Sequence, residues 1–259
     1  MNDEAKQPFM SHLEELRTRL IRSFIAIGIA AVASYAFSEE IFKFLTSPLM
    51  AGLPEGEKMI FTSPTEVIFT YIKIALIVGL LISSPYVFLQ VWKFIAPGLY
   101  QNEKKYVIPF VVCSTVLFVG GTAFGYLMVL PLGFKVLIGM APDNVDAAIK
   151  VNEYFSIATK MLLGIGLGFE MPIIIFFLTK IGVLNIAFLK KNRKYAILLA
   201  FIAAAIFTPP DPVTQCIMAG PMIILFEIGI FFAGFAEKKK KEKEEEENNK
   251  DKDNYQKKY

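Results

Sequence analysis

The stretch LLGIGLGFEMPIIIFFL, residues 162–178, is an almost unbroken apolar run with one carboxylate, Glu170, near its middle. At about 1.5 Å per helical residue, roughly 20 such residues cross the about 30 Å hydrocarbon core of a bilayer. Because hydrocarbon offers backbone amides no water, such runs are predicted to be helices rather than strands of an open sheet. Six apolar runs occur in all, at 21–37, 67–91, 107–130, 161–181, 195–207 and 213–235. The sequence therefore predicts an all-α integral membrane protein with six transmembrane helices.

The composition agrees with this class. Of 259 residues, 54% are hydrophobic and 20% are charged, and the mean hydropathy is +0.49. Soluble domains average about 45–50% apolar and about 25% charged residues. Many of the charges lie in the last 23 residues, so the rest of the chain is more apolar than the average shows.

The distribution of basic residues predicts the orientation in the membrane. Of the 27 Lys and Arg residues, 21 lie in segments on one side of the six runs. Those segments are 1–22, 93–105, 180–194 and 237–259. Basic connecting segments stay on the cytoplasmic side, so both termini are predicted to be cytoplasmic.

We predict one membrane domain over residues 1–236 and a disordered, charged cytoplasmic tail over 237–259, since the tail has almost no apolar residues to bury. The loops 38–66 and 131–160 are amphipathic and are expected to lie on the outer surface. The fifth run has 13 residues and reaches only about 20 Å. Either the bilayer thins beside it, or its basic end snorkels while the TPPDP turn dips inward.

The first run could instead be a cleaved signal peptide, because Ala31-Val32-Ala33 has the small-x-small form of a cleavage site. The 20 residues before the run are long for the start of such a peptide and carry their own helix signals. A retained helix is the favoured reading.

Motifs for catalysis and nucleotide binding are absent from the sequence. It has no G-x-x-x-x-G-K-[ST] phosphate loop, no H-E-x-x-H metal motif and no G-x-S-x-G nucleophile turn, and its one histidine, His12, precedes the first run. We therefore expect no cofactor, no bound metal, no enzymatic activity and no nucleic-acid partner. Energy for any transport would come from a partner or from the membrane gradient.

Two carboxylates stand out near the cytoplasmic face. In SHLEELRTRL, Ser11 and Glu14 have capping-box spacing, and Glu15 either pairs with Arg19 at i,i+4 or remains available to a ligand. Glu103 falls at the start of the third run, where it either complements the helix dipole or faces a ligand. Separated carboxylates at one face could each grip a guanidinium by charge-assisted hydrogen bonds.

A set of six motifs, in this order over residues 10–236, is similar to the TatC family, the signal-peptide receptor subunit of the Sec-independent twin-arginine protein translocase. The motifs are SHLEELRTRL at 11–20, SPTEVIF at 63–69, APGLYQNEKKY at 96–106, GFEMP at 168–172, TPPDPVTQ at 208–215 and LFEIGIF at 225–231.

The resemblance implies a cupped six-helix bundle in a prokaryotic inner membrane. It implies that the protein binds twin-arginine signal peptides of folded cargo and works with TatA-like and possibly TatB-like single-span subunits. It also implies a homo-oligomeric receptor complex in membrane lipid and transport that uses the proton-motive force. Glu15 and Glu103 match the signal-binding carboxylates of the family. Arg17 and Arg19 complete the candidate binding set.

The intramembrane polar residues Glu170, Gln215 and Glu227 form a second set. A charged group at mid-helix is expensive in lipid, so Glu170 is expected to face protein, water or a partner, or to be protonated. The resemblance implies that it lies on the concave side of the bundle, and the hypothesis is that it touches a polar group of a single-span partner there. The alternative is a hydrogen bond within its own bundle. Nearby glycines and Pro172 predict a kink there. Glu227 either bonds inside the bundle or meets a partner, and the turn with Pro209 and Asp211 is predicted to be structural, with Asp211 capping backbone amides.

Two other functions compete with this one. A proton-coupled permease for a small solute would use Glu170 as its relay and would predict internal repeats, but residues 1–130 and 131–235 show no convincing repeat. A membrane enzyme would need a nucleophile, metal or base set, which the motifs do not supply. The translocase receptor is the favoured function.

Overall fold

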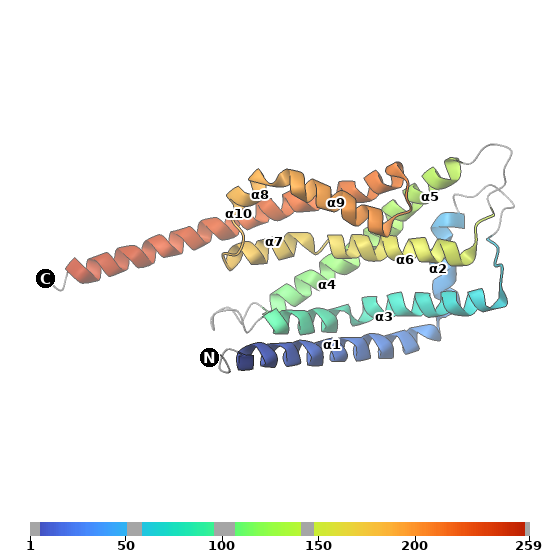
Figure 1. Ribbon diagram of the computed structural model, residues 1–259, viewed down its shortest axis with the longest axis horizontal. Coiled ribbons are helices and arrows are strands. Elements are labelled where there is room, and N and C mark those ends of the chain that lie inside the picture. Colours follow the sequence, from blue (N-terminus) through green and yellow to red (C-terminus); the bar gives the residue numbers. More distant parts are fainter. Residues whose placement is uncertain (1–5, 51–58, 96–106, 141–147, 257–259) are drawn as a thin grey trace.

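A computed structural model of the protein describes residues 6–50, 59–95, 107–140 and 148–256. These residues form helices joined by turns, with one isolated two-residue bridge, so the predicted all-α class is confirmed. The helices are α1 (Lys6–Tyr35), α2 (Ser38–Met50), α3 (Pro64–Ile95), α4 (Val107–Phe124), α5 (Leu130–Gly139), α6 (Val151–Gly168), α7 (Met171–Lys180), α8 (Ile186–Lys191), α9 (Arg193–Phe207) and α10 (Pro212–Gln256). The long helices run roughly along one axis (Figure 1). We call the end where α1 begins the terminal end, and the opposite one the far end.

Several of these helices can cross a membrane. Four helical segments are long and apolar enough by themselves: α3, α4 with α5, α6 with α7, and the first part of α10. The pair α1 and α2, bent by 88°, would be a fifth. The predicted span 195–207 corresponds to α9, whose 15 residues cover only about 22 Å. The protein is therefore a multi-pass membrane protein whose α9 is shorter than the hydrocarbon core.

The helix break predicted near Glu170 is present. Helix α6 ends at Gly168 and α7 begins at Met171, leaving Phe169 and Glu170 in a turn between them. Pro172 lies at the start of α7, where its missing N–H costs nothing. The glycines before the break permit close packing: a Cβ on Gly164 would meet Met218 Cε at 2.3 Å.

Helices α1 and α3 pack side by side along most of their length (Figure 1). At their closest point Gly79 faces Ala31, and a Cβ on Gly79 would lie 2.6 Å from the Ala31 backbone nitrogen. Since no side chain separates the backbones there, this pair fixes how α1 sits against α3. The contact joins the middle of α3 to the part of α1 near Tyr35.

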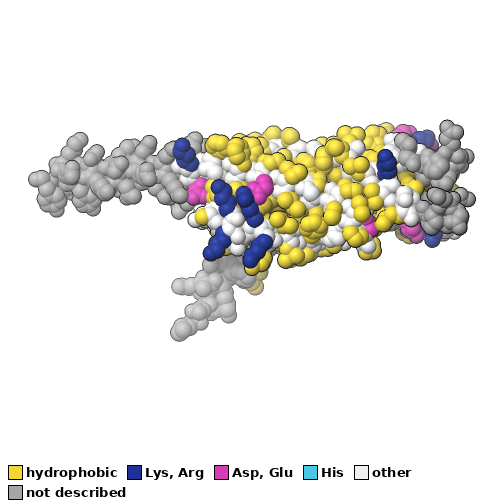
Figure 2. Space-filling model, turned by 90° about the horizontal axis from the view of Figure 1, so that it is seen from above, with side chains coloured by type: hydrophobic (Ala, Val, Ile, Leu, Met, Phe, Trp, Pro, Cys, Tyr) yellow, Lys and Arg dark blue, Asp and Glu magenta, His cyan; other side chains and the backbone are white. Residues whose placement is uncertain are grey.

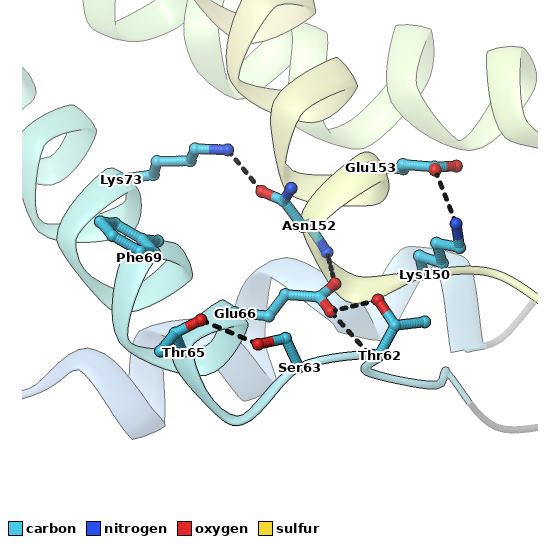
Figure 3. Close-up of a pocket in the computed structure, with 9 residues that line it drawn as sticks. All are labelled: Thr62, Ser63, Thr65, Glu66, Phe69, Lys73, Lys150, Asn152 and Glu153. Carbon is cyan, nitrogen blue, oxygen red and sulfur yellow. Dashed lines mark hydrogen bonds and ion pairs between the residues drawn. The ribbon is translucent and has the colours of Figure 1, made fainter.

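The far end is closed by contacts between two segments distant in sequence. A parallel bridge joins Ile60 to Lys150, and the carboxylate of Glu66 accepts the backbone N–H of Asn152 at 2.8 Å and that of Thr62 at 2.7 Å. Thr62, Glu66, Lys150 and Asn152 are among the residues that line a pocket of about 430 Å³ (Figure 3). Beneath it, an apolar core includes the fully buried Tyr154.

The charged tail differs from its predicted state. Instead of disorder from residue 237, α10 continues as helix through Gln256 and projects beyond the other helices at the terminal end (Figure 1). Lys and Glu dominate the tail, and both are good helix formers. Their composition excludes a packed core but does not prevent a helix that continues from a membrane span.

Candidate functional site

Glu15 and Arg19 meet at the terminal end of α1. Arg19 Nε donates to Glu15 Oε1 at 2.9 Å, and Arg19 Nη2 donates to the same oxygen. Arg19 Nη1 reaches Gln90 Oε1 of α3 at 3.4 Å. The Arg19 side chain is 19% exposed and that of Glu15 is 31% exposed. Arg19 therefore links α1 to α3 and fixes the carboxylate of Glu15 at the rim of the bundle.

The second oxygen of Glu15 faces an aromatic contact. Glu15 Oε2 lies 3.9 Å from His12 Nδ1, and the His12 ring stacks on Phe94, with centroids 4.3 Å apart and an interplanar angle of 14°. A carboxylate oxygen accepts more than one hydrogen bond, so Oε2 keeps capacity for a further donor. The arrangement suits a planar cation such as a guanidinium, which bonds to carboxylates and stacks on ring faces.

Sequence reasoning missed three members of this site. Gln90, Phe94 and His12 are not in the predicted set, although Phe94 lies two residues before the motif APGLYQNEKKY at 96–106, which contains Glu103. Arg17 lies exposed on α1. Glu103 falls outside the described residues.

Glu170 is not on an open face. It is 6% exposed and its carboxyl lies beside Ser114 of α4, whose hydroxyl accepts the indole N–H of Trp92 at 3.2 Å. Among the described residues, Glu170 Oε1 has no hydrogen-bond partner. The break between α6 and α7 carries the side chain into the bundle beside α4, rather than onto an open surface; the role of the carboxyl stays a prediction.

The other intramembrane polar residues join α9 to α10. Gln215 Nε2 donates to the carbonyl of Phe201 at 2.9 Å. Glu227 Oε2 accepts from Arg193 Nη2 at 2.7 Å, with Arg193 49% and Glu227 45% exposed. Both bonds hold the short α9 against the long α10.

The Pro-rich turn before α10 is held locally. Asp211 Oδ1 accepts the backbone N–H of Thr214 at 2.7 Å, as an N-cap does. The N–H of Asp211 itself donates to the carbonyl of Pro209 at 2.8 Å. This turn therefore sets the start of α10.

Within the described ranges, no three His, Cys, Asp or Glu side chains are placed to hold a metal ion. What the arrangement at Glu15 offers is a fixed carboxylate beside an aromatic stack. The chemistry of this arrangement suits a cation.

Comparison with known proteins places the chain in a family. The sequence profile described as Sec-independent protein translocase protein (TatC) matches residues 11–221. The Sec-independent protein translocase protein TatC of Desulforapulum autotrophicum is 47% identical over 237 residues, which are 92% of this chain and 88% of that protein. The protein of the same name from Escherichia coli K12 is 38% identical over 235 residues, 91% of each chain.

A solved structure agrees with this assignment. The crystal structure of a twin-arginine translocase receptor, TatC, superimposes with a TM-score of 0.79 at 41% sequence identity, covering 87% of this chain and 99% of that one. The permease alternative finds no support in these comparisons. The chain belongs to the TatC family of Sec-independent protein translocase proteins.

Proposed function

We propose that this protein is the receptor subunit of a twin-arginine translocase and binds twin-arginine signal peptides through Glu15 and Glu103. The terminal end faces the cytoplasm in this proposal, with both termini inside and the chain in a prokaryotic inner membrane. The excess of Lys and Arg at that end supports the orientation. The similarity to the crystal structure of a twin-arginine translocase receptor supports the function.

The observation that carries the proposal is the state of the Glu15 carboxylate. Arg19 occupies Oε1, while Oε2 faces His12 at a distance too long for a hydrogen bond. A guanidinium of the signal peptide bonds to Oε2, and its plane lies along the stacked rings of His12 and Phe94. Hydrogen bonds to charged groups contribute about 1.5–3 kcal/mol each. The second guanidinium of the pair is assigned to Glu103, and Arg17 and Arg19 on α1 shape the field around Glu15.

The partner side is assigned to α9 and α10. Exposed apolar side chains of α9, including Leu199 at 63% exposure, give a single-span TatA-like or TatB-like helix a surface to pack on. Polar atoms of Gln215 and Glu227 lie on the neighbouring α10. Because α9 is shorter than the hydrocarbon core, the bilayer thins beside it. Folded cargo crosses the membrane beside α9, and this passage uses the proton-motive force. The receptor subunits assemble as homo-oligomers.

Binding of a synthetic signal peptide tests the proposal. The detergent-purified full chain is titrated with a twin-arginine peptide and with a twin-lysine version. Glu15→Ala and Glu103→Ala are each expected to weaken binding about tenfold or more, equivalent to about 1.4 kcal/mol. Glu14→Ala is the matched control, because Glu14 neighbours Glu15 and is exposed.

The twin-lysine peptide is expected to bind less tightly, since an ammonium cannot make the paired, planar contact of a guanidinium. Equal affinities of both peptides for all four proteins would overturn the proposal. A loss in Glu14→Ala as large as in Glu15→Ala would show that general negative charge, not this carboxylate, attracts the peptide.

A further inference from the structure

We propose that a groove between α8 and α10 binds the headgroup of an anionic phospholipid. The groove lies at the terminal end, where the α7–α8 turn meets α10, and has a volume of about 430 Å³. It requires only that the chain lie in a bilayer, so it does not depend on the proposed signal-peptide site. The groove is lined by Ile186, Ala187, Lys190, Gly234, Glu237 and Lys238.

Cationic side chains gather around this groove. They come from the last turn of α8, the first turn of α9 and the adjoining turn of α10. Figure 2 shows dark blue side chains concentrated on this face, where the apolar surface ends. The five cations are Lys190, Lys191, Arg193, Lys194 and Lys238.

Two carboxylates face these cations, and both have partners. Glu227 bonds to Arg193 at 2.7 Å, and Glu237 Oε2 accepts the backbone N–H of Ile186 at 3.1 Å. Among the side chains that the structure describes here, five cations against two carboxylates leave a net charge of +3. Within the described part of the chain, neither Lys190 nor Lys191 makes an ion pair. The face therefore attracts an anion.

The surroundings of the groove select a lipid over a free anion. Its floor is apolar, formed by Ile186, Ala187 and Gly234. Beside it lie exposed apolar side chains, among them Val183 at 67% and Phe188 at 58% exposure. Lysine ammonium groups extend to the headgroup level while their stems cover apolar surface. When the phosphate of a phospholipid lies beside the lysines, the acyl chains of that lipid thus run along the apolar side chains.

The shape of the groove, and not only its charge, defines a site for one lipid. Each Lys or Arg near an anionic membrane contributes about 1 kcal/mol wherever it lies, so charge alone does not localise a lipid. At Gly234 the chain leaves space: an added Cβ would lie 3.8 Å from Ile186 Cδ1, in ordinary contact. A larger side chain at position 234 therefore fills the groove without altering any charge.

Native mass spectrometry of the delipidated full chain in neutral detergent tests this site. The protein is titrated with phosphatidylglycerol, with phosphatidylcholine of the same acyl chains, and with inorganic phosphate. One phosphatidylglycerol is expected to bind about tenfold more tightly than phosphatidylcholine. Inorganic phosphate is expected to displace it only at far higher concentration, since it lacks the acyl chains.

Variants separate charge from shape. Lys190→Gln with Lys238→Gln, and separately Gly234→Leu, are each expected to weaken phosphatidylglycerol binding about tenfold, the loss of roughly one well-made ionic contact. Lys190→Arg with Lys238→Arg is expected to retain binding. The matched control is Lys135→Gln with Lys160→Gln, which removes the same charge from exposed positions elsewhere. If Gly234→Leu lowers the melting temperature, Ala187→Leu fills the groove from exposed α8 instead.

Three outcomes would overturn the site. Equal loss in the control pair would show that only diffuse charge acts. Unchanged binding in both groove-filling variants would show that the lipid lies elsewhere. Displacement of phosphatidylglycerol by inorganic phosphate at the same concentration as the lipid would show that the groove binds phosphate alone, without contacts to acyl chains.

Discussion

Glu66 in the first turn of α3 accepts the backbone N–H of Asn152 in the first turn of α6, at 2.8 Å and across 86 residues of sequence. The same carboxylate accepts the N–H and the hydroxyl of Thr62, and Glu66 is only 8% exposed. The first backbone N–H groups of a helix have no partner within the helix. Lys150, at the N-cap of α6, makes no side-chain capping bond, so Glu66 of α3 supplies the acceptor for the N–H of Asn152 instead. The far end depends on this contact.

We expect Glu66→Gln to lower the melting temperature of the detergent-purified protein by several degrees. The amide of Gln has one acceptor oxygen instead of two, so either Thr62 or Asn152 loses its partner. Circular dichroism at increasing temperature measures the change. Glu153→Gln is the control, since Glu153 lines the same pocket (Figure 3) but is 67% exposed and lies 3.5 Å from Lys150; exposed pairs contribute little. A melting temperature of Glu66→Gln equal to that of the control would contradict the role assigned to Glu66.

Gly79→Ala is expected to separate α1 from α3. The new Cβ would lie 2.6 Å from the Ala31 nitrogen and 2.9 Å from the Ala31 Cβ, and these atoms cannot move without shifting the helix. Overpacking of this kind costs about 1–3 kcal/mol, so the unfolding temperature should fall. Because α1 carries Glu15, signal-peptide affinity should fall with it. Gly28→Ala is the control on α1, where an added Cβ meets nothing within 4 Å and Ala is the better helix former. An unfolding temperature of Gly79→Ala equal to or above that of Gly28→Ala would contradict the packing role of Gly79.

The long helices could be predicted from the sequence because long apolar runs indicate segments that are surrounded by hydrocarbon rather than water. The run 161–181 lies within α6 and α7, and its glycines and Pro172 indicated the break that the structure shows at Phe169 and Glu170. The short fifth span was likewise recognised from its length, and α9 has 15 residues. These features depend on local composition, which a single sequence contains.

Contacts between distant segments could not be predicted in the same way. The bond of Glu66 to Asn152 requires knowing how two loops lie in space, and the approach of Arg19 to Gln90 requires the crossing of α1 and α3. The direction of Glu170 depends on the rotation introduced by the helix break, which hydropathy does not determine. Helicity of the tail was missed because low apolar content excludes burial, not helix formation.

Asp211→Ala is expected to destabilise the start of α10. Asp211 Oδ1 accepts the N–H of Thr214 at 2.7 Å, and loss of such an N-cap costs about 0.5–2 kcal/mol. Asp211→Asn keeps an acceptor oxygen and should retain most of the stability. Hydrogen exchange of the amides at residues 213–215 measures the effect locally. Equal protection in the Ala and Asn variants would show that the turn, rather than the cap, holds the helix start.

Glu170→Met separates a structural from a functional role for the buried carboxyl. Glu170 is 6% exposed and its Oε1 has no hydrogen-bond partner among the described residues. An unsatisfied buried polar group costs about 1–3 kcal/mol, and Met has a similar shape without that cost. We therefore expect the melting temperature of the purified protein to rise. Glu170→Gln is the control, because it keeps a polar group of the same size.

Export of a folded twin-arginine substrate in cells carrying each variant decides what the carboxyl is retained for. A more stable Glu170→Met protein that no longer exports would show that the carboxyl is kept for function at the expense of stability, through a transient contact with a partner helix once the α6–α7 break opens. Export at the normal rate by a stabilised variant would leave Glu170 with no role beyond the bundle. A lower melting temperature would mean that Ser114 or another neighbour satisfies the carboxyl better than the static contacts indicate, and would contradict the expected cost of burying it.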